Sequence, residues 1–207
     1  MAGVTAPTRA DETRAQLLRC AERLFLADGY DAVSVRSICA AAGANPAAVH
    51  YHFGSKDQLT VALLEDRLAP IWVVALDRID PATDSVATLV DAVITPLVAT
   101  ADDPVGHLHL RLLARFALTH PVAPWSKPWF RLDHWATVLI GMVDGLSPDD
   151  ARRRWSLAFE LILLRFGGPS TPSPRTVDAL RAFVAAGLTS PAPDLSTSAQ
   201  PTHGETR

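Results

Sequence analysis

Residues 33–56, with the sequence VSVRSICAAAGANPAAVHYHFGSK, decide the fold. Ser34 is a natural N-cap, because its hydroxyl can accept a hydrogen bond from an unpaired N–H of the first helical turn. Gly43 follows the last apolar residue of that helix, where a left-handed C-terminal cap suits a residue without a Cβ. Asn45 can cap a second helix, with Pro46 at its first position. Two short helices joined by a tight turn are typical of a helix-turn-helix, although a plain helical hairpin has the same pattern.

An amphipathic helix precedes this stretch. Asp11 or Thr13 can cap it, and the dipeptide Asp28-Gly29 ends it. Residues 1–10 are small and polar, so we expect a flexible N-terminal arm. Residues 11–56 then form a three-helix headpiece of a size that suits DNA reading. The apolar stripe of the first helix follows three- and four-residue spacing and consists of Leu17, Leu18, Ala21, Leu24 and Phe25.

The rest of the chain is also predicted to be helical. A long helix starts at Ser55, and Pro70 within it predicts a kink or a break near Ala69. No alternating strand pattern persists, so the predicted fold class is all-α. We expect a regulatory and dimerisation domain over 57–189 and a disordered tail over 190–207. The helical segments of that domain, each followed by a stop signal, are 85–100, 104–119, 127–144, 148–166 and 173–188.

The composition argues against several classes of protein. The formal net charge of -3 gives no global basic signal, which argues against a non-specific polyanion binder. Cys20 and Cys39 lie on apolar helical faces and are expected to be buried thiols. We find no signal peptide and no apolar run near the ~20 residues of a membrane span, so we expect a cytoplasmic protein without a membrane partner. No catalytic motif, phosphate loop or zinc spacing occurs, so we expect no enzymatic activity, no metal and no other cofactor.

The headpiece resembles a known family. The segments AERLF (21–25), DGYDA (28–32), SVRSI (34–38), AGAN (42–45) and VHYHFGSK (49–56) are together similar to the TetR family of bacterial transcriptional regulators. The resemblance implies an all-α homodimer whose N-terminal domains bind a palindromic operator in double-stranded DNA. It also implies that the C-terminal domains bind a small-molecule effector that shifts the spacing of the two headpieces.

The resemblance assigns roles to individual residues. Ser34 and Arg36 match the start of the support helix, where a phosphate is usually met, and residues 44–51 match the recognition helix in the major groove. Tyr51 and Lys56 match positions that commonly contact the DNA backbone. The expected DNA-binding residues are Ser34, Arg36, Asn45, Pro46, Ala47, His50, Tyr51, His52 and Lys56.

The headpiece offers little net positive charge and few base-reading groups. Pro46 and Ala47 stand at positions where members of the TetR family often have side chains that contact bases. Ala47 suits contact with a thymine methyl group. Binding then needs the few cations to lie on one face, helped by helix N-termini that point N–H groups at phosphates. Through residue 57 the basic and acidic residues balance, with Arg9, Arg14, Arg19, Arg23, Arg36 and Lys56 against Asp11, Glu12, Glu22, Asp28, Asp31 and Asp57.

The regulatory half concentrates aromatic and histidine residues. They predict an apolar cavity with a few polar anchors, which is the usual form of a small-molecule site. The alternative is that the aromatic residues are core and the histidines lie on the surface. Arg111 and Arg115 lie four apart on one helix and could pair with an anionic ligand or with Glu160. The expected pocket residues are His107, Arg111, Arg115, Phe116, Trp129, His134 and Trp135.

The last two helices predict a dimer interface. Residues 155–166 leave almost no polar face, and a helix that is apolar all round must be covered on every side. Two helices from each of two subunits would make a four-helix interface with two-fold symmetry, whereas the alternative is that both are core helices of a monomer. The expected interface residues are Trp155, Phe159, Ile162, Leu163, Phe166, Leu180, Phe183 and Val184.

These observations favour a homodimeric transcriptional regulator, a repressor rather than an activator, that an effector releases from its operator. One alternative is a DNA-binding regulator without a small-molecule inducer. Another is a helical ligand-binding or enzymatic module with a vestigial headpiece.

Overall fold

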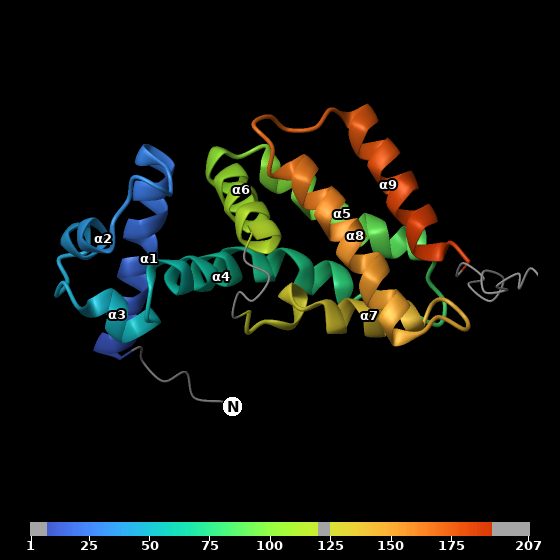
Figure 1. The fold of residues 1–207 in the computed structure, drawn as a ribbon, viewed down its shortest axis with the longest axis horizontal. Coiled ribbons are helices and arrows are strands. Elements are labelled where there is room, and N and C mark those ends of the chain that lie inside the picture. Colours follow the sequence, from blue (N-terminus) through green and yellow to red (C-terminus); the bar gives the residue numbers. More distant parts are fainter. Residues whose placement is uncertain (1–7, 120–124, 192–207) are drawn as a thin grey trace, which may run out of the picture.

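The computed structural model describes residues 8–119 and 125–191, except for the side chains of residues 74–76. Within these residues every regular element is a helix, which confirms the all-α fold class. The headpiece lies at one end of an elongated molecule and the larger regulatory domain at the other (Figure 1). Residues 1–7 of the expected arm and 192–207 of the expected tail lie outside the described residues.

Helices α1 (Arg9–Asp28), α2 (Val35–Ala41) and α3 (Ala48–Phe53) form the headpiece. Helix α1 begins earlier than expected, because Thr8 rather than Asp11 is its N-cap. The Thr8 hydroxyl accepts a hydrogen bond from the Asp11 N–H at 3.2 Å, and the Asp11 carboxylate accepts one from the Thr8 N–H at 3.0 Å. This capping box satisfies two N–H groups at once, so the helix extends into the expected arm.

The turn between α2 and α3 has the expected chemistry but a later helix start. Ser34 is the N-cap of α2, as predicted. Gly43 has a φ of +60°, the left-handed conformation that favours glycine. The Asn45 side-chain oxygen accepts a hydrogen bond from the Ala47 N–H at 2.8 Å, but residues 45–48 form a turn and α3 begins at Ala48. The segment expected to be the recognition helix therefore consists of a capped turn followed by a helix of 6 residues.

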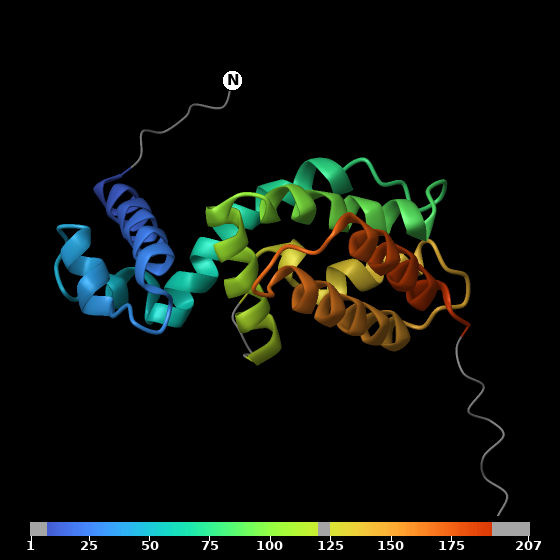
Figure 2. The same ribbon diagram turned by 90° about the horizontal axis from the view of Figure 1, so that it is seen from above.

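Helix α4 (Lys56–Leu76) connects the two domains and packs in both of them (Figure 2). It contacts α1 and α3 near its start and the regulatory helices further along, with Leu59 and Trp72 both buried. The helix continues through Pro70, so the break considered near Ala69 does not occur. Proline removes one hydrogen bond from a helix, and burial on both sides of it offsets that loss here.

The regulatory domain consists of five α-helices and one short 3₁₀ helix in the described residues. The expected segment 127–144 is not one helix: Pro128 starts a 3₁₀ turn, Arg131 is extended at φ −114°, and the following helix ends at Ile140. The other four segments agree with the prediction to within one residue. The elements are α5 (Val86–Ala101), α6 (Pro104–Thr119), η1 (Pro128–Phe130), α7 (Leu132–Ile140), α8 (Pro148–Phe166) and α9 (Pro174–Thr189).

None of the helices in residues 8–119 and 125–191 is both long enough and apolar enough to cross a bilayer.

Candidate DNA-binding surface and ligand cavity

The recognition surface is the outer side of α3 and of the turn before it. Val49 is fully buried and anchors α3 in the headpiece core, while His50 and Tyr51 lie on the outside. Tyr51 is 83% exposed, so its ring and hydroxyl are accessible to a partner. Residues 45–47 are exposed as well, and His52 is half-buried. The expected base-reading residues therefore share one surface.

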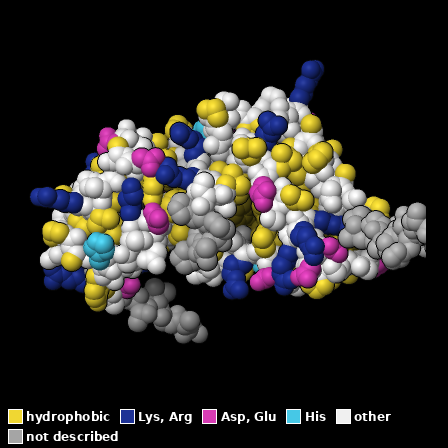
Figure 3. Space-filling view, in the orientation of Figure 1, with side chains coloured by type: hydrophobic (Ala, Val, Ile, Leu, Met, Phe, Trp, Pro, Cys, Tyr) yellow, Lys and Arg dark blue, Asp and Glu magenta, His cyan; other side chains and the backbone are white. Residues whose placement is uncertain are grey.

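A groove separates this surface from the first half of α1. Arg9 and Arg19 line the α1 side, together with the carboxylate of Glu12. The basic and acidic residues of the headpiece are equal in number. The guanidinium groups of Arg9 and Arg19 nevertheless lie beside the recognition element, where they could contact the phosphate backbone of DNA. Figure 3 shows Lys and Arg side chains at this end of the molecule. The wall of the groove opposite α1 includes Asn45, Ala47, Tyr51 and His52. Ser34 and Arg36 are exposed at the start of α2 and do not line the groove.

His50 presents a hydrogen-bond acceptor to the outside. Its Nδ1 lies 2.9 Å from the carbonyl oxygen of Gly54, and a carbonyl can only accept, so Nδ1 carries the proton. In the neutral ring Nε2 then has a free lone pair, which suits the exocyclic amino group of adenine or cytosine. The adjacent rings of Tyr51 and His52 meet edge to face, with centroids 5.0 Å apart.

Lys56 has a structural role that the sequence did not indicate. Its ammonium donates hydrogen bonds to the backbone carbonyls of Tyr30 at 3.0 Å and Val33 at 2.9 Å, and it lies 4.0 Å from the centre of the Tyr30 ring. The Tyr30 hydroxyl donates to Asp57 in turn, and burial together with that contact raises the pKa of Tyr30 above its ordinary value. Lys56 therefore connects α4 to the segment between α1 and α2, and its expected phosphate contact stays a prediction.

Replacing Lys56 by methionine removes two charge-assisted hydrogen bonds and should lower the free energy of unfolding by about 2 kcal/mol. The measurement is urea unfolding followed by circular dichroism. The control is Arg36→Met, at an exposed position of the same headpiece, where we expect a change within about 0.5 kcal/mol. Equal stability of both variants and the wild type would show that the carbonyl contacts contribute nothing.

A cavity of about 500 Å³ lies inside the regulatory domain, within the size range of small-molecule sites. Two of its rings are fixed by their indole N–H groups: Trp72 donates to the Val93 carbonyl at 3.2 Å and Trp135 to the Trp129 carbonyl at 2.9 Å. With their donors satisfied, these rings offer apolar faces and edges to a ligand. The aromatic residues that line the cavity are Trp72, Trp125, Trp129, Phe130, Trp135 and Phe159.

The buried carboxylate of Glu65 supports one wall of the cavity. It accepts hydrogen bonds from the backbone N–H and the hydroxyl of Ser126 and from the N–H of Lys127 at 2.8 Å. These residues follow Trp125, whose ring stacks on Phe130 with centroids 4.9 Å apart. Glu65 thus ties α4 to the aromatic segment that precedes α7.

The cavity also has charged residues on its lining. Asp133 accepts a hydrogen bond from Arg152 at 2.6 Å, and this contact lowers the pKa of Asp133. Glu160 accepts a hydrogen bond from Ser156 at 3.1 Å and is exposed. A few polar groups beside many aromatic rings can orient a ligand that is held mainly by apolar contact.

The expected pocket residues separate into two groups. Trp129 and Trp135 line the cavity, and their contact with a ligand stays a prediction. His107, Arg111 and Arg115 instead line a second groove, between the headpiece and α6 and α8, and Arg115 pairs with Asp31 at 2.7 Å rather than with Glu160. Phe116 is buried against Tyr30, and His134 packs edge-on against Trp129 without lining the cavity.

The helical period explains this separation. Residues 107, 111 and 115 recur every four positions on the side of α6 that faces the headpiece, whereas Leu113 and Ala117 lie on the side that faces the cavity. Trp72 was not among the expected pocket residues, because it lies on α4, outside the region in which aromatic and histidine residues concentrate. Phe159 was expected at the dimer interface, but it lines the cavity. The concentration of aromatic residues between 125 and 135 was the sequence feature that pointed to the cavity.

Most residues of the expected dimer interface are buried within a single protomer. Phe159 lines the cavity, and only Phe183 is exposed, at 69%. The outer face of α8 carries other apolar residues, Leu157 at 67% and Leu164 at 63% exposure, and Figure 3 shows hydrophobic side chains exposed over this region. One face of α8 and one face of α9 pack in the core of the protomer, and the apolar residues of these faces are the ones that the sequence analysis assigned to the interface. The residues buried within the protomer are Trp155, Ile162, Leu163, Phe166, Leu180 and Val184.

Comparison with known proteins identifies the headpiece. Residues 17–63 match the family model for bacterial regulatory proteins of the tetR family. Over 59 residues the chain is 42% identical to the HTH-type transcriptional repressor Rv3405c of Mycobacterium tuberculosis. The headpiece therefore matches the TetR family. The match to the mycobacterial protein covers 28% of this chain and 31% of that protein, so the chain spans about a third of the length of this relative.

Solved structures extend the likeness to the fold of the regulatory domain. The multidrug binding protein EbrR, complexed with imidazole, superposes with a TM-score of 0.63 at 23% identity, over 92% of this chain and 97% of its own. NalD of Pseudomonas aeruginosa, the secondary repressor of the MexAB-OprM multidrug efflux pump, gives a TM-score of 0.60 at 21% identity, over 88% and 98%. The likeness in fold therefore spans both domains.

Proposed function

We propose that this protein is a homodimeric transcriptional repressor that binds a palindromic operator and is released by a small molecule in the aromatic cavity. The observation that carries the proposal is a TetR-family headpiece whose recognition surface is exposed and uncovered, with Tyr51 at 83% exposure. Helix α4 joins this surface to the cavity through buried residues of both domains. A site for DNA and a site for a ligand are thus connected by one rigid element.

The outer faces of α8 and α9 support the homodimer. Leu157, Leu164 and Phe183 are large, apolar and more than 60% exposed, a pattern that marks association surfaces. On α9, Ala186 and Gly187 are exposed near Phe183, and a Cβ added to Gly187 would meet nothing within 4 Å. Small residues of this kind let a partner helix approach closely, and a two-fold contact would pair two headpieces for the two halves of an operator.

The lining of the cavity supports a flat, mainly apolar aromatic effector. Six aromatic residues surround a volume of about 500 Å³, and ring-on-ring contact favours planar ligands. The effector must bind the DNA-incompetent arrangement more tightly than the competent one, since only a difference in affinity moves the equilibrium. EbrR, a multidrug binding protein with a similar fold, is consistent with an aromatic site of this type.

Dimerisation is tested by a charge on each exposed helix face. The double variant Leu164→Glu/Phe183→Glu should sediment as a monomer with an unchanged far-UV spectrum, because both side chains are outside the protomer core. Ile140→Glu, at an exposed apolar position of α7, is the matched control and should sediment like the wild type. A double variant that remains dimeric would exclude this interface.

DNA binding is tested with fragments selected by the protein from a genomic library. Tyr51→Ala should weaken binding to the selected fragment about tenfold without loss of stability, since the ring contacts little of the protein itself. Fluorescence anisotropy gives the affinity, and Ile140→Ala serves as the control. Failure of the wild-type chain to enrich any fragment would contradict the proposed function.

The effector site is tested by a thermal-shift screen of aromatic compounds. A compound that binds the native state raises the melting temperature and should also release the selected DNA fragment. Ser156→Trp, which places a large side chain on the cavity lining, should abolish both effects. A compound that stabilises the Ser156→Trp variant equally well binds elsewhere.

A further inference from the structure

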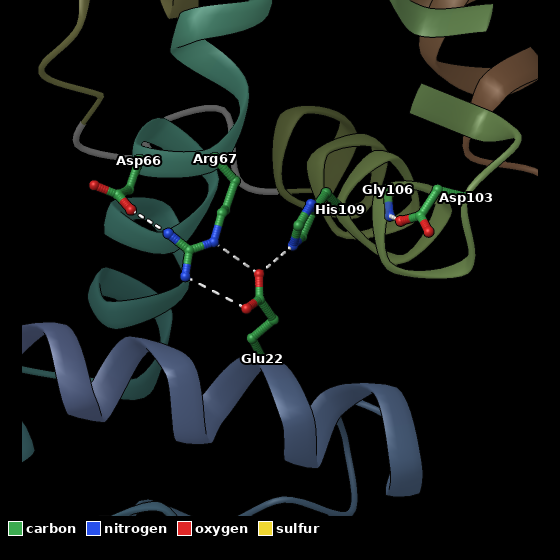
Figure 4. Close-up of polar contacts among 6 residues, drawn as sticks. All are labelled: Glu22, Asp66, Arg67, Asp103, Gly106 and His109. Carbon is green, nitrogen blue, oxygen red and sulfur yellow. Dashed lines mark hydrogen bonds and ion pairs between the residues drawn. The ribbon is translucent and has the colours of Figure 1, made fainter. Parts of the chain in front are cut away.

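One carboxylate of the headpiece contacts two of the helices that line the cavity, α4 and α6. Oε1 of Glu22, on α1, accepts a hydrogen bond from Nε2 of His109 on α6 at 2.8 Å and another from Nε of Arg67 on α4 at 2.9 Å. Figure 4 shows Glu22 reaching from α1 toward the space between the other two helices. We call Glu22, Arg67 and His109 the Glu22 latch. Its members are 42 or more residues apart in sequence, so it forms only through tertiary packing.

The Glu22 latch is largely shielded from water. The side chain of His109 is 7% exposed and that of Glu22 is 19% exposed. Burial lowers the pKa of His109, so its ring is neutral near pH 7. Burial alone would raise the pKa of Glu22, but the hydrogen bonds and charge of Arg67, with His109, lower it. An ionised carboxylate only accepts, so the neutral ring donates from Nε2.

Further contacts hold the members of the Glu22 latch in position. The second carboxylate oxygen of Glu22 lies 3.4 Å from Arg67, whose guanidinium also contacts Asp66. Asp103 caps the start of α6, where its carboxylate accepts a hydrogen bond from the Gly106 N–H at 2.8 Å (Figure 4). Because His109 is one turn further along α6, this cap also fixes the part of the helix from which His109 donates.

Both donors of the Glu22 latch lie about one helical turn from the cavity. Leu113 follows His109 by four residues on α6 and lines the cavity, and Trp72 follows Arg67 by five residues on α4 and lines it too. A molecule in the cavity that separates Leu113 from Trp72 must therefore also shift His109 relative to Arg67. A single oxygen that accepts at 2.8 and 2.9 Å cannot follow two diverging donors.

We propose that the Glu22 latch transmits the state of the cavity to the headpiece: it is closed when the cavity is empty and breaks when the cavity is filled. The inference rests on the proposed function, because it concerns the coupling between the cavity and the DNA-binding surface. With the latch closed, α1 is held to α4 and α6 and the headpiece has one orientation. With the latch broken, α1 loses its polar contact to α6, and the headpiece is released from that orientation. The coupling should then appear as a change in DNA affinity.

A filled cavity can be imitated by mutation. Ala117→Trp places a large side chain on the cavity side of α6, and Ala117→Ser is a control that adds almost no volume. We expect Ala117→Trp to weaken binding to the genome-selected fragment by fivefold or more, within the usual range of about 5- to 150-fold for coupled sites. In a Glu22→Gln background, where the charged acceptor is absent, Ala117→Trp should change the affinity less than twofold. Asp28→Asn, which removes another carboxylate from the exposed end of α1, should retain the full effect.

His109 provides a second test with a conservative variant. His109→Leu removes the donor and should behave like Glu22→Gln, whereas His109→Gln retains an N–H donor and should keep most of the effect of Ala117→Trp. All five tryptophans lie in residues 72–155, so their emission reports whether the regulatory domain of each variant is folded. An equal effect of Ala117→Trp in wild-type and Glu22→Gln backgrounds would overturn the latch while leaving the proposed function intact.

Amide hydrogen exchange of full-length protein without DNA gives a readout that is independent of operator binding. Ala117→Trp should accelerate exchange along α1 in the wild-type background and add nothing in the Glu22→Gln background. No acceleration along α1 in the wild-type background would overturn the proposal, as would an affinity for DNA that Ala117→Trp does not change. Absence of DNA binding by every variant, with exchange behaving as expected, would instead contradict only the proposed function.

Discussion

The structure depends on one helix that belongs to two hydrophobic cores. Helix α4 buries Leu59 near its start and Trp72 near its end, so the same rigid rod is part of the headpiece and of the cavity wall. Lys56 fastens its first turn to the connection between α1 and α2, and Glu65 fastens its middle to the segment before η1. Neither domain can change its position relative to the other without altering contacts of this helix.

Local chemistry was sufficient to predict the headpiece. Ser34 as a cap, the left-handed Gly43 and the buried Val49 depend on neighbours within a few residues, and each follows from rules about helix ends and periodicity. The role of Lys56 could not be predicted in the same way, because its acceptors are 23 and 26 residues earlier in the chain. A motif match assigned this residue to DNA, and packing shows that it also holds two backbone carbonyls.

The regulatory half shows the limit of periodicity more clearly. An apolar stripe on α8 shows that the helix is buried on one side but not which neighbour covers it, so Trp155 and Ile162 were assigned to a partner although they fill the protomer core. Similarly, Arg111 and Arg115 share a face of α6 as expected, but that face lies against the headpiece rather than the cavity. Only the three-dimensional arrangement of the helices distinguishes these cases. The aromatic content, in contrast, pointed to the region that contains the cavity, and two of the expected residues, Trp129 and Trp135, line it.

Several cations of the headpiece contact other groups of the headpiece itself. Lys56 is bound to carbonyls, Arg14 lies over the Phe53 ring, and Arg19 donates to the Gln16 side chain at 2.6 Å. Non-specific attraction to DNA arises from the counterions that free cations release, with a slope of about −0.9 per neutralised phosphate. The three contacts position these side chains but leave their charges in place, and Arg19 still lines the groove beside the recognition element. On the proposed function, a headpiece whose six basic residues are balanced by six acidic ones would hold unrelated sequence weakly, and most copies would remain free to reach the operator.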